Sequence, residues 1–239
     1  MSRMAVVGGH SILGSAFAAG AERVAVELPS GPVVAVLDAG AHVVLQRHGL
    51  DRYTAAHAVD HRANLRALAQ LDCDRVLALS SVGGLRPEIS VGTFLAPDDF
   101  IALHLGVSYF DDDPGHRVPG FDPRWRRRVV EAWRARAEPA LRDGGVYWQT
   151  IGPRFETPAE IRLLAAHADV VGMTVASECV LAGELGLAYA AVCVVDNLAN
   201  GVGDRPLTLE EFEKGKAANR GHLLAALDAV LPDLAGAAP

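Results

Sequence analysis

The chain has 239 residues, of which 50% are hydrophobic and 21% are charged, and its formal net charge is -7 at pH 7. This length fits one large globular domain or two small ones, and the acidic balance excludes the overall positive field that attracts nucleic acid. No apolar run reaches the roughly eighteen residues of a membrane span, and a strand-like segment directly follows the first residues, so we expect a cytoplasmic protein without a signal peptide.

Strand-like and helix-like segments alternate along the chain. Apolar runs predict strands at residues 4–7, 33–37, 42–45, 75–79, 93–96, 146–151, 170–173 and 188–195. Amphipathic spacing predicts helices at residues 60–71, 125–141, 161–168, 176–185 and 208–230. Because no repeat or linker interrupts this alternation, we expect a single α/β domain over residues 1–239, with a central mixed β-sheet flanked by helices.

Two of the predicted strands end in turns that suit an anion. Open α/β sheets bind ligands at the carboxyl ends of their strands. The paired glycines of Gly8-Gly9-His10-Ser11 let backbone N–H groups approach an anion closely, although a simple turn before a helix fits as well. Arg47-His48-Gly49 either offers a cationic fork for phosphate or forms an ordinary surface turn.

Two further strand ends carry hydroxyl and amide groups. The segment Ser80-Ser81-Val82-Gly83-Gly84 follows a wholly apolar strand, and its hydroxyl and N–H groups can form a nest for a small anion. Asp196-Asn197 ends the late apolar strand. This pair is either an Asx-type turn or a site for the edge of a base, since an Asn amide both donates and accepts hydrogen bonds.

Residues 152–160 join a predicted strand to a predicted helix and form the most informative stretch of the chain. Thr157 and Glu160 stand at the N-cap and N3 positions of a capped helix start. Capping does not explain why Phe155 stands beside Glu156. We expect Phe155 to cover the flat face of a heterocycle and Glu156 to accept hydrogen bonds from its ring N–H groups.

Several common catalytic signatures are missing from the sequence. It has no P-loop, no nucleophile elbow and no metal-ligand spacing, and its three cysteines are far apart. The candidate groups instead bind an anion and a heterocycle. This combination suits a reaction in which phosphate itself is the nucleophile, and we expect neither a metal nor an organic cofactor.

These features resemble the trimeric purine nucleoside phosphorylase and methylthioadenosine phosphorylase family almost from end to end. The most specific motifs are residues 152–157 and residues 172–174 with Glu178, supported by residues 47–49 and 80–86. The resemblance implies a nucleoside phosphorylase-like fold and a homotrimer. It also implies that a purine nucleoside and inorganic phosphate, a co-substrate, are converted to a free base and a pentose 1-phosphate.

The resemblance implies a role for each motif residue. The residues that would hold phosphate are His10, Ser11, Arg47, His48, Ser80, Ser81 and Thr174. The residues that would contact base and ribose are Phe155, Asp196, Met173, Leu209 and His116, the last from a loop that closes the pocket of a neighbouring subunit. Glu156 and Asn197 would be catalytic, because they would stabilise charge that develops on the purine ring. His10-Ser11 departs from the more usual Ser/Thr-Gly pair.

The substrate is left open between several alternatives. Glu156 with Asn197 resembles the 6-oxopurine enzymes, whose substrates have an N1–H donor that adenine lacks. A match shifted by one residue places Asp196 at the base edge and suits adenine. Leu209, where 5′-hydroxyl enzymes often carry His, suits a 5′-methylthio group, so methylthioinosine and methylthioadenosine are alternative substrates. A purine-binding protein without catalysis is an alternative of another class.

Overall fold

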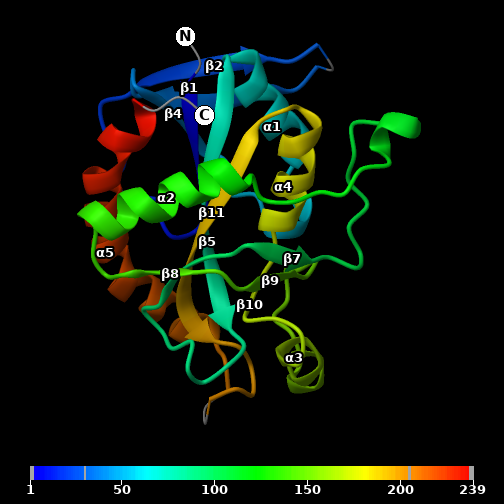
Figure 1. Ribbon diagram of the computed structural model, residues 1–239, viewed down its shortest axis with the longest axis vertical. Coiled ribbons are helices and arrows are strands. Elements are labelled where there is room, and N and C mark those ends of the chain that lie inside the picture. The colour runs from blue at the N-terminus through cyan, green and yellow to red at the C-terminus, as the bar shows by residue number, and fades with distance from the viewer. Residues whose placement is uncertain (1–2, 30, 204–205, 237–239) are drawn as a thin grey trace.

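Eleven strands form one mixed sheet in the part of the chain that the computed structural model describes, residues 3–29, 31–203 and 206–236 (Figure 1). The main strand order is β2-β3-β4-β1-β5-β10-β9-β7, while β11 pairs with β5 and β6, and β6 also pairs with β8. The strands are β1 (Arg3–Gly8), β2 (Glu22–Glu27), β3 (Val33–Asp38), β4 (His42–Gln46), β5 (Cys73–Gly84), β6 (Phe94–Ala96), β7 (Asp99–Ile101), β8 (Leu141–Asp143), β9 (Val146–Gln149), β10 (Val170–Gly172) and β11 (Ala188–Leu198). The α-helices are α1 (His61–Gln70), α2 (Pro123–Arg136), α3 (Pro158–Ala165), α4 (Val175–Glu184) and α5 (Leu209–Ala235), and the short 3-10 helices are η1 (Ala56–Ala58) and η2 (Asp113–Gly115).

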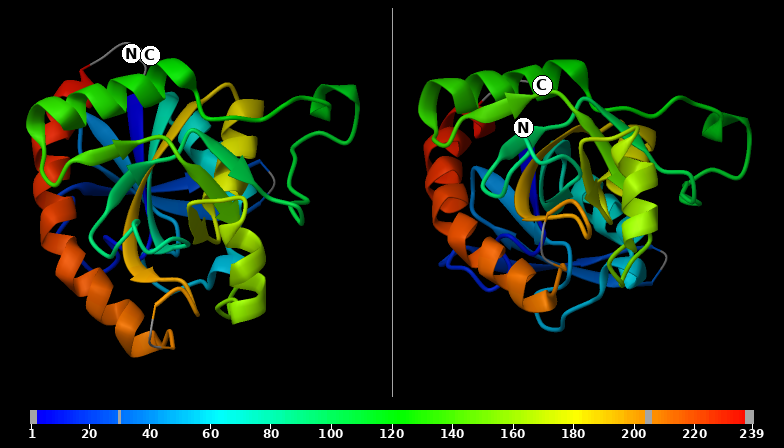
Figure 2. Two further views of the ribbon diagram at one scale, coloured as in Figure 1. Left: turned by 60° about the horizontal axis from the view of Figure 1, so that its bottom comes forward. Right: turned by 90° about the horizontal axis from the view of Figure 1, so that it is seen from below.

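Helices cover both faces of the central strands, as β1 shows. Met4 and Val6 pack in the apolar cluster beneath α2 and α5, whereas Ala5 and Val7 pack in the cluster beneath α1 and α4. Successive side chains of a strand point to opposite faces, so both faces of β1 are buried. Figure 2 shows the helices on the two sides of the sheet. This arrangement explains why the central strands are continuous apolar runs in the sequence and confirms the predicted α/β class.

The sheet divides along one edge of β5. On its other edge, β5 pairs with the parallel strand β11 from Arg75 to Gly84. On the dividing edge it pairs with β1 only as far as Ala78 and with β10 only from Gly83 onward. Residues 79–82 therefore border an opening at the carboxyl ends of β1 and β4.

Some predicted elements have different limits. The strand predicted to stop before Ser80 continues to Gly84, because β11 pairs with it throughout. The helix predicted over residues 125–141 ends at Arg136, after which the chain forms β8 beside β6. Strands β2, β7 and β8 are not predicted by the sequence. Within the described residues, every helix is too short or too polar to serve as a membrane span.

Candidate active site

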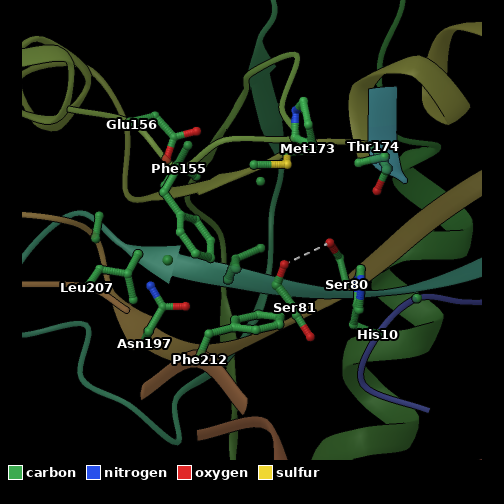
Figure 3. Close-up of a pocket in the computed structure, with 18 of the residues that line it drawn as sticks. His10, Ser80, Ser81, Phe155, Glu156, Met173, Thr174, Asn197, Leu207 and Phe212 are labelled. Carbon is green, nitrogen blue, oxygen red and sulfur yellow. Dashed lines mark hydrogen bonds between the residues drawn. The ribbon is translucent and has the colours of Figure 1, made fainter. Parts of the chain in front are cut away.

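The opening beside β5 leads into a pocket of about 210 Å³. Its walls come from the loops after β1, β4, β9, β10 and β11, from the carboxyl-terminal parts of β5, β10 and β11, and from the start of α5. The predicted site residues that line it are His10, Arg47, His48, Ser80, Ser81, Phe155, Glu156, Met173, Thr174, Asn197 and Leu209. Figure 3 shows the aromatic ring, the carboxylate and the amide toward one end, and the hydroxyls and an imidazole toward the other.

Glu156 is held at one end of this pocket by the turn that leads into α3. The predicted capping box is present, since Thr157 Oγ1 accepts from the Glu160 N–H at 3.3 Å and Glu160 Oε2 accepts from the Thr157 N–H at 2.7 Å. The Thr150 hydroxyl donates to Glu156 Oε1 at 2.6 Å. Arg154 turns outward and forms two hydrogen bonds of 2.8 Å with Glu160. Because Thr150 fixes Oε1 of Glu156, its other carboxylate oxygen is left for a ligand.

Asn197 and Phe155 complete this end of the pocket. The Asn197 side-chain nitrogen donates to the Leu198 carbonyl at 3.0 Å, which leaves its second N–H and its amide oxygen for a ligand. The Phe155 ring centroid lies 6.0 Å from that of Phe212. Together with Glu156, these groups form a slot with a flat aromatic wall and a polar edge that both donates and accepts. Such a slot fits a planar nitrogen heterocycle.

Met173 lies between the two ends of the pocket (Figure 3). It packs against Gly152, whose φ is +71° and whose added Cβ would lie 2.5 Å from the Met173 sulfur. Only glycine fits this position, because its φ is unfavourable for L side chains and no space remains for one. The thioether offers an apolar surface against which a sugar ring can pack.

Arg47 is the cation at the opposite end of the pocket, and it is 3% exposed. Its Nε and Nη2 donate to the two carboxylate oxygens of Glu178, the Nη2 bond measuring 2.8 Å, and its Nη1 donates to the Leu79 carbonyl at 3.0 Å. Burial favours the neutral form of Arg47, but the adjacent Glu178 carboxylate outweighs burial and raises the pKa of the guanidinium. Nη1 and Nη2 each keep a second N–H, which can bind an oxyanion. Gly9 makes room for this group, since a Cβ there would lie 2.5 Å from Arg47 Nη1.

Hydroxyl groups surround the same end. Thr174 precedes α4, and its side chain makes no capping hydrogen bond to that helix. The Ser80 hydroxyl makes one long contact, 3.4 Å to the Ser81 carbonyl (Figure 3). The Ser81 hydroxyl has no partner among the described residues. The hydroxyls of Thr174 and Ser80 are thus available to a ligand, and hydroxyls next to a fixed guanidinium suit an anion. The Ser81 hydroxyl is instead buried on the side of Asp196, which corrects its expected contact with phosphate.

His10 and His48 lie against each other at this end, with ring centroids 4.3 Å apart. Burial lowers the pKa of each ring to about 4, so both are neutral at pH 7. His48 Nδ1 lies 2.8 Å from the Thr54 carbonyl, which can only accept, so Nδ1 carries the proton and Nε2 keeps its lone pair. The positive charge at this end of the pocket therefore comes from Arg47.

Three predicted site residues lie outside the pocket lining. Ser11 is 2% exposed and its hydroxyl has no partner among the described residues, so the expectation that it binds phosphate is corrected. Asp196 is 1% exposed and accepts a hydrogen bond of 2.8 Å from Asn219 in α5, which corrects its expected contact with the base. His116 is exposed in the loop that contains η2, and this loop extends away from the body of the chain (Figure 2). Phe121, from the same loop, is buried against Tyr189.

Three large apolar or aromatic residues of the pocket, Tyr53, Leu207 and Phe212, are among those that the sequence did not predict; smaller ones are Ala56, Val171 and Ala199. Phe212 lies one helical turn after Leu209, so helical periodicity in the predicted last helix could have placed the two on the same face. Tyr53 and Leu207 lie in loops, where no periodic signal exists.

Comparisons with known proteins agree on one family. The model of the family described as "Phosphorylase superfamily" matches residues 5–232. A protein of Archaeoglobus fulgidus named probable 6-oxopurine nucleoside phosphorylase is 39% identical over 215 residues, which cover 88% of each chain. A protein of Methanothermobacter thermautotrophicus named probable S-methyl-5′-thioinosine phosphorylase is 36% identical over 192 residues, 80% of this chain and 68% of that one. The structure of methylthioadenosine phosphorylase from Schistosoma mansoni in complex with adenine superimposes with a TM-score of 0.84 at 21% identity, covering 100% of this chain and 93% of that chain, and this likeness concerns the fold.

Proposed function

This chain belongs to the phosphorylase superfamily, and we propose that it catalyses the phosphorolysis of purine nucleosides with a preference for 6-oxopurines of the inosine and guanosine type. One observation carries the proposal. A single pocket has Phe155, Glu156 and Asn197 at one end and Arg47 with hydroxyl groups at the other, separated by an apolar surface that fits a sugar. This is the arrangement that a nucleoside and an inorganic oxyanion need in order to meet at the anomeric carbon.

The polar groups at the base end support the 6-oxopurine preference. Glu156 has one free carboxylate oxygen, which accepts the N1–H of hypoxanthine or guanine, whereas N1 of adenine is an acceptor. The free N–H of Asn197 can donate to N7 of the base. A match with the family that is shifted by one residue would place Asp196 at the base edge and favour adenine. In the structure, Asp196 instead accepts a hydrogen bond from Asn219 behind the pocket.

The reaction follows from this arrangement. The bond between C1′ and the base nitrogen stretches first, its electron pair moves onto the purine, and the sugar acquires oxocarbenium character. Asn197 donates to the ring and stabilises the purine more strongly as negative charge develops on it, which lowers the barrier, while Glu156 holds the base in place through its N1–H. Phosphate held by Arg47, Ser80 and Thr174 offsets the charge on the sugar, and one of its oxygens then bonds to C1′. The purine leaves after taking up a proton, which balances the proton that HPO₄²⁻ gives up when its oxygen bonds to C1′, and the enzyme forms no covalent intermediate.

A second candidate substrate is 5′-methylthioinosine. Leu207, Leu209 and Phe212 line the pocket, and none of these side chains can hydrogen bond to a 5′-hydroxyl. A relative that is 36% identical carries the name of a thioinosine phosphorylase. An apolar wall suits a 5′-methylthio group. The base end of the pocket would bind the base of such a thionucleoside in the same way as that of inosine.

We also propose that the protein acts as a homotrimer in the cytoplasm. Leu209 lines the pocket but is 67% exposed, which leaves an apolar side chain at the pocket mouth for a neighbouring subunit to cover. The loop that contains His116 extends away from the chain and is available to such a neighbour (Figure 2). Light scattering on the purified protein measures the assembly directly, and a monomer would contradict this proposal.

One experiment tests the reaction and its substrate together. Purified protein is incubated with inosine, guanosine, 5′-methylthioinosine or 5′-methylthioadenosine, with and without phosphate, and base and sugar products are separated by chromatography. We expect phosphate-dependent release of hypoxanthine or guanine with formation of a pentose 1-phosphate. Release without phosphate would identify a hydrolase, tight binding without release a purine-binding protein, and a preference for methylthioadenosine would overturn the assignment of the base edge.

A further inference from the structure

A buried carboxylate lies directly behind the cation of the pocket. Glu178, in the first turn of α4, is 0% exposed, and both of its oxygens accept hydrogen bonds from Arg47. The Tyr189 hydroxyl donates to Glu178 Oε2 at 2.7 Å, the same oxygen that binds Arg47 Nη2. His61 is the remaining polar neighbour, with Nδ1 3.7 Å from Oε1.

Neither Glu178 nor Tyr189 reaches the pocket. Both are absent from its lining, and Tyr189 lies at the start of β11, at the end of that strand opposite Asn197. Any effect of Tyr189 on a ligand must therefore pass through Glu178 and Arg47. At this one carboxylate, Arg47 from the end of β4 meets α4 and the start of β11, two consecutive elements that lie far from Arg47 in the sequence.

We propose that Glu178 and Tyr189 are positioning residues that hold the Arg47 guanidinium in the orientation needed to bind an inorganic oxyanion. This inference rests on the proposed function of the pocket. Two hydrogen bonds to Glu178 and one to the Leu79 carbonyl fix the plane of the guanidinium, so its remaining N–H groups point in set directions. Tyr189 in turn restrains rotation of the Glu178 carboxylate.

Stability alone is a weak explanation for this arrangement. Burying an ion pair seldom stabilises a fold more than apolar side chains of the same volume would, because both charges lose their hydration. The pair does provide a cation that cannot swing away or be released to solvent when the pocket is empty. A binding group held in place before its ligand arrives loses less conformational freedom on binding.

The test is the Tyr189→Phe variant, which removes the hydroxyl and keeps the buried ring. Isothermal titration with inorganic phosphate alone measures anion affinity without catalysis, and steady-state kinetics give the KM for phosphate, the KM for inosine and kcat. Tyr109→Phe is the matched control, since it removes a hydroxyl that donates to the Arg62 carbonyl outside the pocket. Glu178→Gln is the second variant, because it disrupts the same link at the carboxylate.

We expect Tyr189→Phe to weaken phosphate binding about three- to tenfold and to raise the KM for phosphate equally. This is less than the full loss of a hydrogen bond to a charged group, because the hydroxyl acts on phosphate only through Glu178 and Arg47. The KM for inosine and kcat at saturating phosphate should stay within about twofold, Tyr109→Phe should match the wild type, and Glu178→Gln should show a larger loss of phosphate affinity. Unchanged phosphate affinity in folded Tyr189→Phe or Glu178→Gln protein, or an equal loss of phosphate and inosine affinity, would overturn the inference. Absence of phosphate binding and base release in the wild type would overturn the proposed function itself.

Discussion

Replacing Glu156 by Gln should abolish the preference for 6-oxopurines. The Thr150 hydroxyl donates to Glu156 Oε1 at 2.6 Å, whereas its alternative acceptor, the Gly172 carbonyl, lies 3.4 Å away. The shorter bond favours a Gln oriented with its oxygen toward Thr150 and its NH₂ group toward the base. That NH₂ group would meet the N1–H of hypoxanthine, donor against donor, but would donate to N1 of adenine.

The size of this effect follows from the bond that is lost. A hydrogen bond to a charged group contributes roughly 2–3 kcal/mol, so kcat/KM for inosine should fall about 30- to 150-fold. The assay is kcat/KM for inosine and adenosine at saturating phosphate. Glu160→Gln is the matched control, because Glu160 pairs with Arg154 outside this pocket and should change neither value. An inosine-to-adenosine ratio that is the same in Glu156→Gln and the wild type would refute the assigned role of Glu156.

Three further predictions test other parts of the site. Asn197→Ala should lower kcat for inosine roughly 100-fold, as loss of a donor to a developing charge does, and near-normal turnover in a stopped or continuous assay would contradict its role. The pKa values of His10 and His48 lie near 4 against 6.5 in an unfolded chain, so the unfolded state binds more protons between these values. The free energy of unfolding, measured with urea, should therefore fall as the pH drops from 6.5 to 4, by at most on the order of 3 kcal/mol for each histidine taken alone. His10→Asn should reduce this loss. A free energy of unfolding that does not change with pH would argue against two buried neutral rings. Leu209→His should shift kcat/KM from methylthioinosine toward inosine by roughly tenfold, and an unchanged ratio would show that Leu209 does not contact the 5′ group.

The sequence predicted the helices and strands whose structure is determined by residues close together in the chain. Continuous apolar runs bounded by glycine or aspartate gave the central strands, and the capping residues Thr157 and Glu160 marked the start of α3. The missed strands are of another kind. β2 has exposed charged ends, and β7 and β8 have three residues each, so they are strands only because a neighbouring strand offers hydrogen bonds.

The site was predictable to the extent that it follows from topology. Arg47 and Asn197 lie at the carboxyl ends of parallel strands, which meet at one edge of a sheet, and Ser80 lies in the parallel strand β5 between them. Strand β10 runs antiparallel to β5, so Thr174 enters the same pocket from the opposite direction. The direction of a side chain was harder to predict than the position of its residue. Ser11 directly follows His10, which lines the pocket, but Ser11 is not part of the lining. Contacts such as that of Arg47 with Glu178 join residues 131 positions apart, for which a single sequence contains no signal.

The direction in which the side chains of β11 point bears on the question that the sequence left open, namely whether Asp196 or Asn197 faces the pocket. Val192 and Val194 pack in the cluster beneath α2 and α5, whereas Cys193 and Val195 pack in the cluster on the opposite face of the sheet. The alternation continues past the apolar part of the strand. Asp196 accordingly faces α5, where Asn219 donates both to its carboxylate at 2.8 Å and to the Val195 carbonyl at 3.1 Å.

Because Asp196 faces α5, the side chain of the next residue, Asn197, points toward the pocket. The pairing of β11 with β5 skips Asp196, so Asn197 stands opposite Gly83, a position that borders the pocket. For Asp196 to face the pocket instead of Asn197, the strand would have to turn its buried face outward, because side chains alternate with a period of two. Val192 and Val194 would then lose their apolar surroundings. The packing of these four apolar residues thus supports the proposal that the amide of Asn197, rather than the carboxylate of Asp196, meets the base.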